Sequence, residues 1–169
     1  SDNILMVDAD SLFGKEYFEK ILNKSQDLSW SHPFFHGYNW IVLLPGRDNP
    51  VTRVSPHLGI ASSGGVWFTT KTFFNKIGNM NENYFGYGRE DSDLWIRASS
   101  LLYGIPELSY PLTHQYHHWE VMDSSKDPNY QKNCRLWHYT THKTDEVIKK
   151  LINADLGNPK EPTLIDMEE

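Results

Sequence analysis

Apolar residues along the chain fall into short runs and into helical patterns, and the two kinds alternate. Three short apolar runs bounded by acidic residues, glycines or turn formers predict strands at residues 4–7, 39–44 and 64–70. Apolar positions at helical spacing predict four helices, at residues 14–23, 71–78, 90–104 and 144–157. Thr144 is the predicted N-cap of the last helix, and turn formers at the start of residues 45–57 predict a loop there. This order indicates an α/β fold with a mixed sheet and flanking helices.

Length and composition describe one folded domain. The 169 residues are 38% hydrophobic and 22% charged, which suits a globular protein with its own core. We expect residues 1–156 to form this domain and residues 157–169, with their prolines and acidic end, to form a flexible tail. Because the apolar run at residues 4–7 comes almost at the first residue, we also expect the chain to be a fragment without its upstream part.

Charge and cysteine content exclude some classes of partner and cross-link. A net charge of −6 argues against nucleic acid or an anionic membrane as the main partner, because either favours a basic face. No apolar run approaches the roughly 18 residues that a membrane-spanning helix requires. Cys134 is the single cysteine, so the chain has no internal disulfide and its thiol suits a reducing compartment.

Two aspartates follow the first predicted strand, in the sequence VDAD. Strand alternation points Asp8 and Asp10 to the same side if the extended backbone continues. Ligands of open α/β sheets bind at such carboxyl ends of strands, and two neighbouring carboxylates favour a divalent cation between them. The alternative is that Asp8 caps a turn and Asp10 caps the helix that follows. Both interpretations stay open at this point, because D-x-D is a short motif.

A histidine cluster, THQYHHWE, lies further along the chain. Neutral imidazoles bind Mn²⁺, Zn²⁺ or Fe²⁺ well and Mg²⁺ poorly, so a histidine beside the two aspartates would indicate manganese. The candidates are His114, His117 and His118. Their spacing is not the H-E-x-x-H of a zinc protease, and the alternative is a surface cluster that binds no ligand.

The segment GYGREDSDLW, residues 86–95, gathers charged groups at the start of the third predicted helix. The helix dipole favours acidic residues in a first turn, so Glu90 or Asp93 alone requires no further function. The glycines on both sides of Tyr87 allow close approach of the backbone to a ligand and movement of the segment. A carboxylate beside such a segment can act as a general base toward a hydroxyl. We therefore predict Asp91 as a base and Tyr87 as an aromatic face for a sugar.

Together these features resemble the C-terminal module of the β-1,4-galactosyltransferase and chondroitin polymerase type of glycosyltransferase. Residues 64–98, GGVWFTTKTFFNKIGNMNENYFGYGREDSDLWIRA, are similar to the family's Gly-Gly strand and helix followed by G-W-G-x-E-D-x-D-L. With the D-x-D and the histidine motif, the resemblance spans residues 4–118, and residues 119–169 resemble nothing in it. It implies the C-terminal part of a GT-A fold and a missing N-terminal half of the same polypeptide that holds most of the nucleotide pocket.

The resemblance further implies a metal-dependent hexosyltransferase. The donor is a UDP-sugar with a hexose of the Gal, GalNAc, GlcNAc or GlcA type, the acceptor is a glycan hydroxyl, and the cofactor is Mn²⁺ rather than Mg²⁺. Asp91 corresponds to the base of an inverting enzyme, because related retaining enzymes typically lack an aspartate after the glutamate. Such enzymes serve polysaccharide or glycan synthesis, and we expect this one in the bacterial cytoplasm or at the periphery of its membrane.

The same resemblance assigns roles to individual residues. The implied metal ligands are Asp8, Asp10, His114 and His117. The residues implied to bind the donor are Asp8, Gly64 and Gly65. Those implied to bind the acceptor are Tyr87, Arg89 and Glu90. Tyr87 replaces the mobile tryptophan of the family and Arg89 replaces a common glycine, so the resemblance does not extend to the identity of the acceptor or to the movement of the segment, although it still implies the base.

Two other functions fit parts of the sequence. A haloacid-dehalogenase-type phosphatase also presents D-x-D after an apolar strand, but it expects threonine or valine where Leu12 stands and leaves the histidines and the glycine block unexplained. A non-catalytic carbohydrate-binding or interaction domain is compatible with the 6 Trp, 9 Tyr and 8 Phe and with a missing donor half. Such a domain would be indifferent to Mn²⁺, whereas the transferase requires it.

Overall fold

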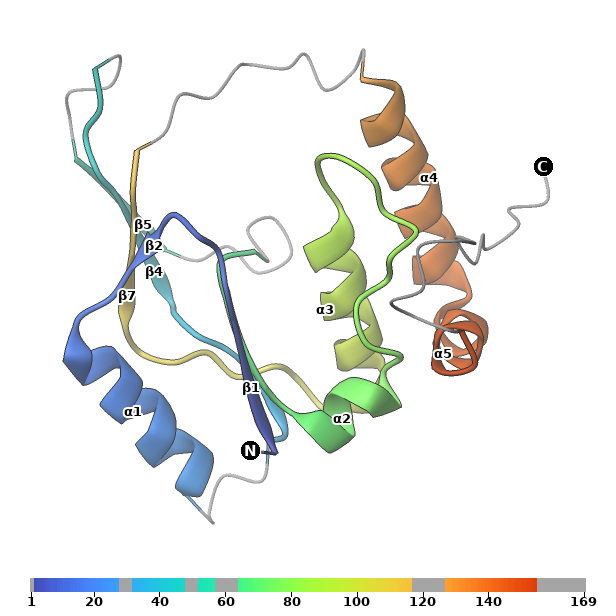
Figure 1. The fold of residues 1–169 in the computed structure, drawn as a ribbon, viewed down its shortest axis with the longest axis horizontal. Helices are drawn as coiled ribbons and strands as arrows, with labels where there is room; N and C mark the ends of the chain where they lie inside the picture. Colours follow the sequence, from blue (N-terminus) through green and yellow to red (C-terminus); the bar gives the residue numbers. More distant parts are fainter. Residues whose placement is uncertain (1, 28–31, 48–51, 57–63, 117–126, 155–169) are drawn as a thin grey trace. The chain divides into compact units, whose positions relative to one another are not determined.

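The computed structural model describes residues 2–27, 32–47, 52–56, 64–116 and 127–154. These residues form a mixed α/β fold with two sheets and five helices (Figure 1). The strands are β1 (Asn3–Val7), β2 (Ser11–Leu12), β3 (Phe34–His36), β4 (Trp40–Leu43), β5 (Arg53–Pro56), β6 (Val66–Thr70) and β7 (Pro111–His114). The helices are α1 (Lys15–Gln26), α2 (Lys71–Lys76), α3 (Glu90–Leu101), α4 (Pro128–His142) and α5 (Thr144–Ile152).

The chain divides into two units, and each is described by itself. The first unit contains residues 1–71 and 104–118, and the second contains residues 72–103 and 119–169. Both sheets belong to the first unit. One is antiparallel with the strand order β1-β6-β3, and the other has the order β2-β7-β4-β5 with β4 and β7 parallel. The second sheet is therefore mixed, as the sequence predicts.

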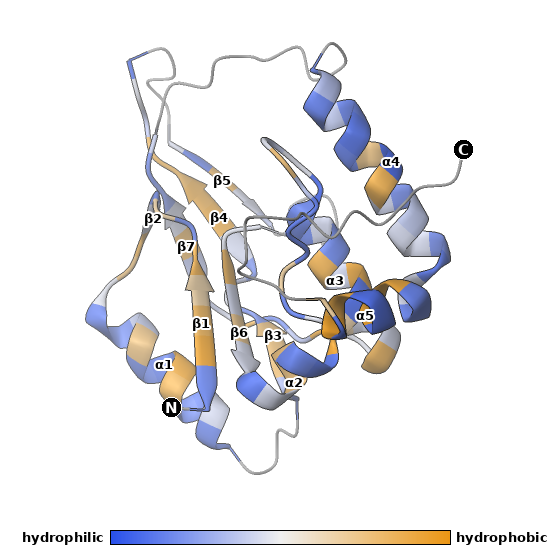
Figure 2. Cartoon of the chain, turned by 45° about the vertical axis from the view of Figure 1, so that its right-hand side comes forward, coloured by the Kyte–Doolittle hydropathy of each residue, from blue (hydrophilic) through white to orange (hydrophobic). Residues whose placement is uncertain are grey.

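Apolar side chains from α1 and from both sheets share the core of the first unit. Tyr17 and Ile21 lie one turn apart on α1 and are buried, which explains the helical spacing of apolar residues there. They belong to a cluster with Phe35, Tyr38, Val66, Phe68, Leu108 and Leu112. Figure 2 shows β1 and β4 as mainly apolar strands, in agreement with their contributions to this core. The core fixes the ends of the strands, where the candidate site lies.

The second unit is helical in its described part. Leu94 and Ala98 of α3 are fully buried, and Val147 and Leu151 of α5 pack with Leu136 of α4. The chain leaves α2 through Gly78, whose φ of +86° favours glycine. This glycine is the predicted stop of the helix at residues 71–78. No helix in the described part of the chain is long and apolar enough to cross a membrane.

The predicted strands and helices are present, with shifts of a few residues at their ends, but two predictions of detail are wrong. Residues 45–57 do not form a loop throughout, because β5 pairs antiparallel with β4. Thr144 is not an N-cap: it is the first residue of α5, and its hydroxyl donates to Thr140 O at 2.7 Å. The predicted tail at residues 157–169 lies outside the described residues.

Helix α4 is the largest element that the sequence pattern does not predict. Its N-cap is Asp127, whose side chain accepts hydrogen bonds from the backbone N–H groups of Asn129 and Tyr130. Pro128 occupies the first helical position, where its missing N–H has no intrahelical partner to lose. Asp-Pro is thus the local signal by which the start of this helix could have been found.

Candidate functional site

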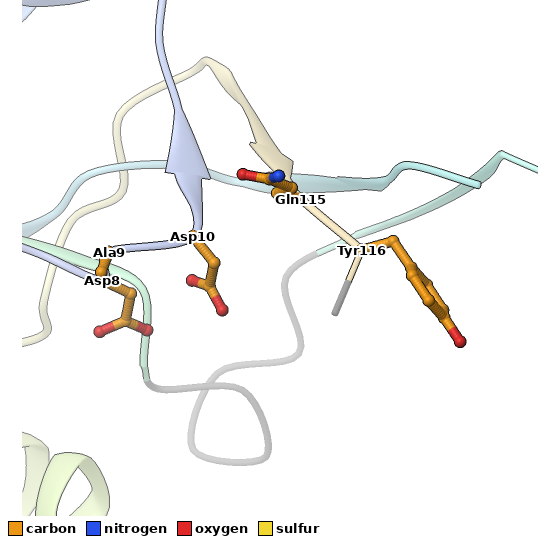
Figure 3. Close-up of a pocket in the computed structure, with 5 residues that line it drawn as sticks. All are labelled: Asp8, Ala9, Asp10, Gln115 and Tyr116. Carbon is orange, nitrogen blue, oxygen red and sulfur yellow. The ribbon is translucent and has the colours of Figure 1, made fainter. Parts of the chain in front are cut away.

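A turn after β1 places Asp8 and Asp10 at a hollow in the first unit. β1 ends at Val7, and Ser11 N donates to Asp8 O at 3.0 Å, so the extended backbone does not continue. Strand alternation is therefore the wrong reason for their alignment, yet Figure 3 shows both carboxylates pointing to the same side of the chain. The hollow has a volume of about 550 Å³ and is lined by Asp8, Ala9, Asp10, Gln115 and Tyr116.

Pairing of β2 with β7 brings Asp10 to His114. Ser11 is the register partner of His114, and Gln115 N donates to Asp10 O at 2.7 Å. The side chains then meet: His114 Nε2 lies 3.2 Å from Asp10 Oδ2, with 20% and 32% of the two side chains exposed. Two residues that are 104 positions apart in the sequence are thus joined at one edge of the mixed sheet.

The Asp10 and His114 pair has the donor chemistry of a site for a borderline divalent cation. One imidazole nitrogen and one carboxylate oxygen suit Mn²⁺, Fe²⁺ or Zn²⁺, and two ligands at about 2.1 Å from one ion can be roughly 3 Å apart. Among the described residues, no group of three or more His, Cys, Asp or Glu side chains forms a metal site. His117, the other predicted histidine ligand, and His118 lie outside the described residues.

Gly64 and Gly65 lie at the same edge as Asp8. Asp8 N donates to Gly65 O at 2.8 Å, so the predicted donor-binding residues are neighbours. The Tyr38 hydroxyl donates to Gly64 O at 2.7 Å, and His36 Nε2 lies 3.2 Å from the same oxygen. His36 and Tyr38 are buried residues that sequence reasoning did not single out. They hold the backbone of the glycine pair in place.

Gly65→Ala should lower the free energy of unfolding by about 2–4 kcal/mol. Gly65 has a φ of +98°, and a Cβ there would lie 2.9 Å from Tyr38 Cε1 and 3.0 Å from Leu112 Cδ2. Both backbone strain and crowding therefore oppose a side chain. Urea unfolding of the variant measures the loss.

Gly104→Ala is the matched control for this substitution. Gly104 has a similar φ of +82°, but nothing lies within 4 Å of the added Cβ. The control carries only the strain of the left-handed backbone, about 1–2 kcal/mol. Equal losses in the two variants would contradict the packing around Gly65.

In the second unit, the segment before α3 has an unusual backbone. Gly86, Gly88 and Arg89 have φ values of +73°, +98° and +81°. A Cβ on Gly88 would also lie 2.9 Å from two ring carbons of Tyr130. The glycines on both sides of Tyr87 therefore have a structural reason in the conformation of this segment, besides any approach to a ligand.

Arg89 has a positive φ, in a region of backbone conformation that favours glycine. A non-glycine residue in this region costs roughly 1–2 kcal/mol. Contacts of the side chain offset this cost: the guanidinium lies over the Trp137 ring at 4.8 Å, and Nη2 donates to the Tyr130 hydroxyl at 3.4 Å. A hydrogen bond to Cys134 raises the pKa of Arg89, so its charge is retained. The side chain of Arg89 is thus directed to α4.

The acidic residues at the start of α3 divide into two kinds. Glu90 and Asp91 are the first two residues of the helix and are half-buried, and Glu90 Oε2 has no hydrogen-bond partner among the described residues. Asp93 instead is fully buried and ion-paired with Arg97, 2.7 Å from Nη2. Asp93 is therefore structural, while Glu90 and Asp91 stay candidates for the chemistry of the site.

Asp93 and Arg97 hold the loop that follows α2. Arg97 Nη1 donates to the carbonyl oxygens of Ile77 and of Asn79, the latter at 2.7 Å. The Tyr84 hydroxyl donates to Asp93 Oδ1 at 3.2 Å. Burial, together with the Asp93 charge, raises the pKa of Tyr84 far above its usual range, so the phenol stays protonated and keeps this bond.

The predicted site residues thus fall into two groups. Asp8, Asp10, Gly64, Gly65 and His114 belong to the first unit, where the structure brings them to one edge of the sheets. Tyr87, Arg89, Glu90 and Asp91 belong to the second unit, in consecutive positions at the start of α3.

Comparison with known proteins gives one family. Residues 51–120 match the family model described as the N-terminal domain of galactosyltransferase, a segment that contains the glycine pair, the start of α3 and His114. No curated protein and no solved structure matches the chain. The family match supports a galactosyltransferase-like glycosyltransferase module in this chain.

Proposed function

We propose that this chain is an inverting, Mn²⁺-dependent hexosyltransferase of glycan or polysaccharide synthesis, with a UDP-sugar as donor and a sugar hydroxyl as acceptor. The observation that carries the proposal is the meeting of His114 and Asp10 at 3.2 Å, beside Asp8, in a chain with a galactosyltransferase family match. A histidine with carboxylates is a donor set for Mn²⁺ rather than Mg²⁺.

Asp8, Asp10, His114 and His117 are the residues that would hold the metal ion. When bound, Mn²⁺ would offset the negative charge that grows on the departing diphosphate. The hydrogen bond from Gln115 N to Asp10 O and the pairing of β2 with β7 hold the backbones of Asp10 and His114 in register. The chain would thus present Asp10 and His114 from a hydrogen-bonded edge of the sheet, and Gly64 and Gly65 beside Asp8 would line the donor sugar.

Asp91 is the proposed base. It takes the proton of the acceptor hydroxyl while the oxygen attacks the anomeric carbon from the face opposite the leaving group. The bond from that carbon to the diphosphate breaks, the diphosphate leaves with the electron pair, and the configuration is inverted. Glu90, whose Oε2 is buried without a partner among the described residues, would accept a hydrogen bond from an acceptor hydroxyl, and the half-exposed ring of Tyr87 would stack on a sugar.

Titration of Mn²⁺ by calorimetry tests the metal site. We expect the unaltered chain to bind Mn²⁺, and Asp10→Asn or His114→Ala to weaken binding at least 10-fold, because each removes a ligand. UDP added after the metal then reports whether the chain holds a nucleotide.

His138→Ala is the control for nonspecific imidazole binding. His138 and His142 form an imidazole pair, exposed on α4, with 3.1 Å between their Nε2 atoms. Loss of Mn²⁺ binding in this variant, with unchanged binding in Asp10→Asn, would contradict the proposed metal site.

A carbohydrate-binding domain without catalysis is the second candidate. Phe85 and Tyr87 favour it, because the two residues are 75% and 53% exposed on one short segment and exposed aromatic rings can stack on sugars. Sugar binding that persists in a metal chelator, with no transfer from any UDP-sugar, would favour this candidate over the transferase.

A further inference from the structure

Helix α4 contacts the whole of the segment that precedes α3, Phe85–Arg89. Tyr130, Asn133 and Trp137 are spaced by three and four residues and so lie on one face of α4. The Tyr130 ring stacks on Tyr87, with 6.2 Å between the ring centroids, and the Trp137 ring lies under the guanidinium of Arg89. This helix begins at residue 128, beyond the segment that the family model matches.

Asn133 makes the central contact between α4 and Phe85–Arg89. Its Nδ2 donates to Phe85 O at 3.1 Å and to Tyr87 O at 3.2 Å, while its Oδ1 accepts from Phe85 N at 3.3 Å. The residue is 2% exposed, so water does not readily replace these bonds. One buried amide therefore fixes the backbone on both sides of Gly86.

The backbone of Phe85–Arg89 requires such a contact. Gly86 and Gly88 adopt positive φ values without strain but leave the backbone more conformational freedom to restrict, and Arg89 adopts one at a cost, so the surrounding structure must hold the segment. The side chains of Phe85 and Tyr87 are mainly exposed, so their own burial supplies little of the energy needed. The three hydrogen bonds that hold this segment come instead from Asn133, a residue that is 2% exposed.

We propose that Asn133 is a positioning residue that fixes Phe85–Arg89 and thereby sets the position of the Tyr87 ring for the acceptor sugar. The role assigned to Tyr87 rests on the proposed transferase function, whereas the fixing of the backbone does not. Asn133 touches neither the proposed base nor the proposed metal ligands in any contact described above, so it acts through the segment. Helix α4 is then part of the acceptor side of the protein.

Amide hydrogen exchange followed by mass spectrometry or NMR tests the fixing of the backbone. In Asn133→Ala, we expect the Phe85 amide, which loses its acceptor, to exchange on the order of 10-fold faster. Leu136→Val is the matched control, since Leu136 is buried on the same helix in the contact with α5. It should lower stability without a selective effect on Phe85. Equal exchange at Phe85 in the two variants would overturn the proposal.

Steady-state kinetics test the consequence for the acceptor. We expect Asn133→Ala to raise the KM for the acceptor at least 5-fold and to leave the KM for the UDP-sugar unchanged, a split that general destabilisation would not produce. An unchanged acceptor KM together with faster Phe85 exchange would overturn the link to the acceptor. If the unaltered protein transfers no sugar, the transferase proposal fails, and the exchange experiment still decides whether Asn133 fixes the segment.

Discussion

Asp91→Asn should lower kcat for glycosyl transfer by about 10²- to 10⁴-fold. The amide keeps the shape of the carboxylate but cannot take the proton of the acceptor hydroxyl. Asp91 lies at the second position of α3, in the second unit, and none of the proposed metal ligands is in that unit. Mn²⁺ affinity should therefore stay unchanged. Initial rates with a UDP-sugar and a saccharide acceptor, together with the Mn²⁺ titration, measure both quantities.

Glu90→Gln is the matched control for the base. Glu90 is the neighbouring carboxylate, and its proposed role is to bind the acceptor, so its loss should raise the acceptor KM more than it lowers kcat. A larger loss of kcat in Glu90→Gln than in Asp91→Asn would assign the base to Glu90 instead. Retention of the rate within 10-fold in Asp91→Asn would contradict general base catalysis by this residue.

Arg97→Met should lower the free energy of unfolding by roughly 3–5 kcal/mol. Both side chains of the Asp93–Arg97 pair are 0% exposed, so the substitution leaves a carboxylate buried without its partner. It also removes the donor to the carbonyl oxygens of Ile77 and Asn79. Urea unfolding followed by circular dichroism measures the loss.

The double variant Asp93→Asn/Arg97→Met separates charge from packing. No buried charge remains in it, so it should recover part of the stability that Arg97→Met loses. If the free energy of unfolding of the double variant is lower than that of Arg97→Met, removal of the Asp93 charge recovers no stability. The buried carboxylate is then not the source of the loss. A loss below about 1 kcal/mol in Arg97→Met would contradict the burial of the pair.

Helices with apolar buried faces can be predicted from the sequence, and α4 shows why others cannot. The predicted helix at residues 144–157 buries Val147, Ile148 and Leu151, which have the spacing that periodicity detects. The residues that α4 buries are Asn133, Leu136 and Thr140, two of which are polar. The side chains of Asn133 and Thr140 make hydrogen bonds inside the unit. Because both residues are polar, their burial is not visible in the hydropathy pattern of the sequence.

The residue types of the candidate metal site are predictable, but the pairing of its residues is not. VDAD and the histidine motif each predict ligands, and the family match covers only the second of them. Which histidine meets which aspartate depends on β2, a strand of two residues that is too short to leave a periodic pattern. The role of Asp93 is also not predictable from the sequence. Its position in the first turn of a helix suggests an interaction with the helix dipole, whereas the structure shows it buried and paired with Arg97.

The pairing of β2 with β7 also has a consequence for folding during translation, because it can form only after β7 has been synthesised. Residues 72–103, which belong to the second unit, lie between β6 and β7 in the sequence. A nascent chain therefore contains Asp10 and the whole of β1 to β6 long before β7 is synthesised. Closing so long a loop is slow compared with local helix formation. The contact between Asp10 and His114 is consequently among the last native contacts of the first unit that can form during translation.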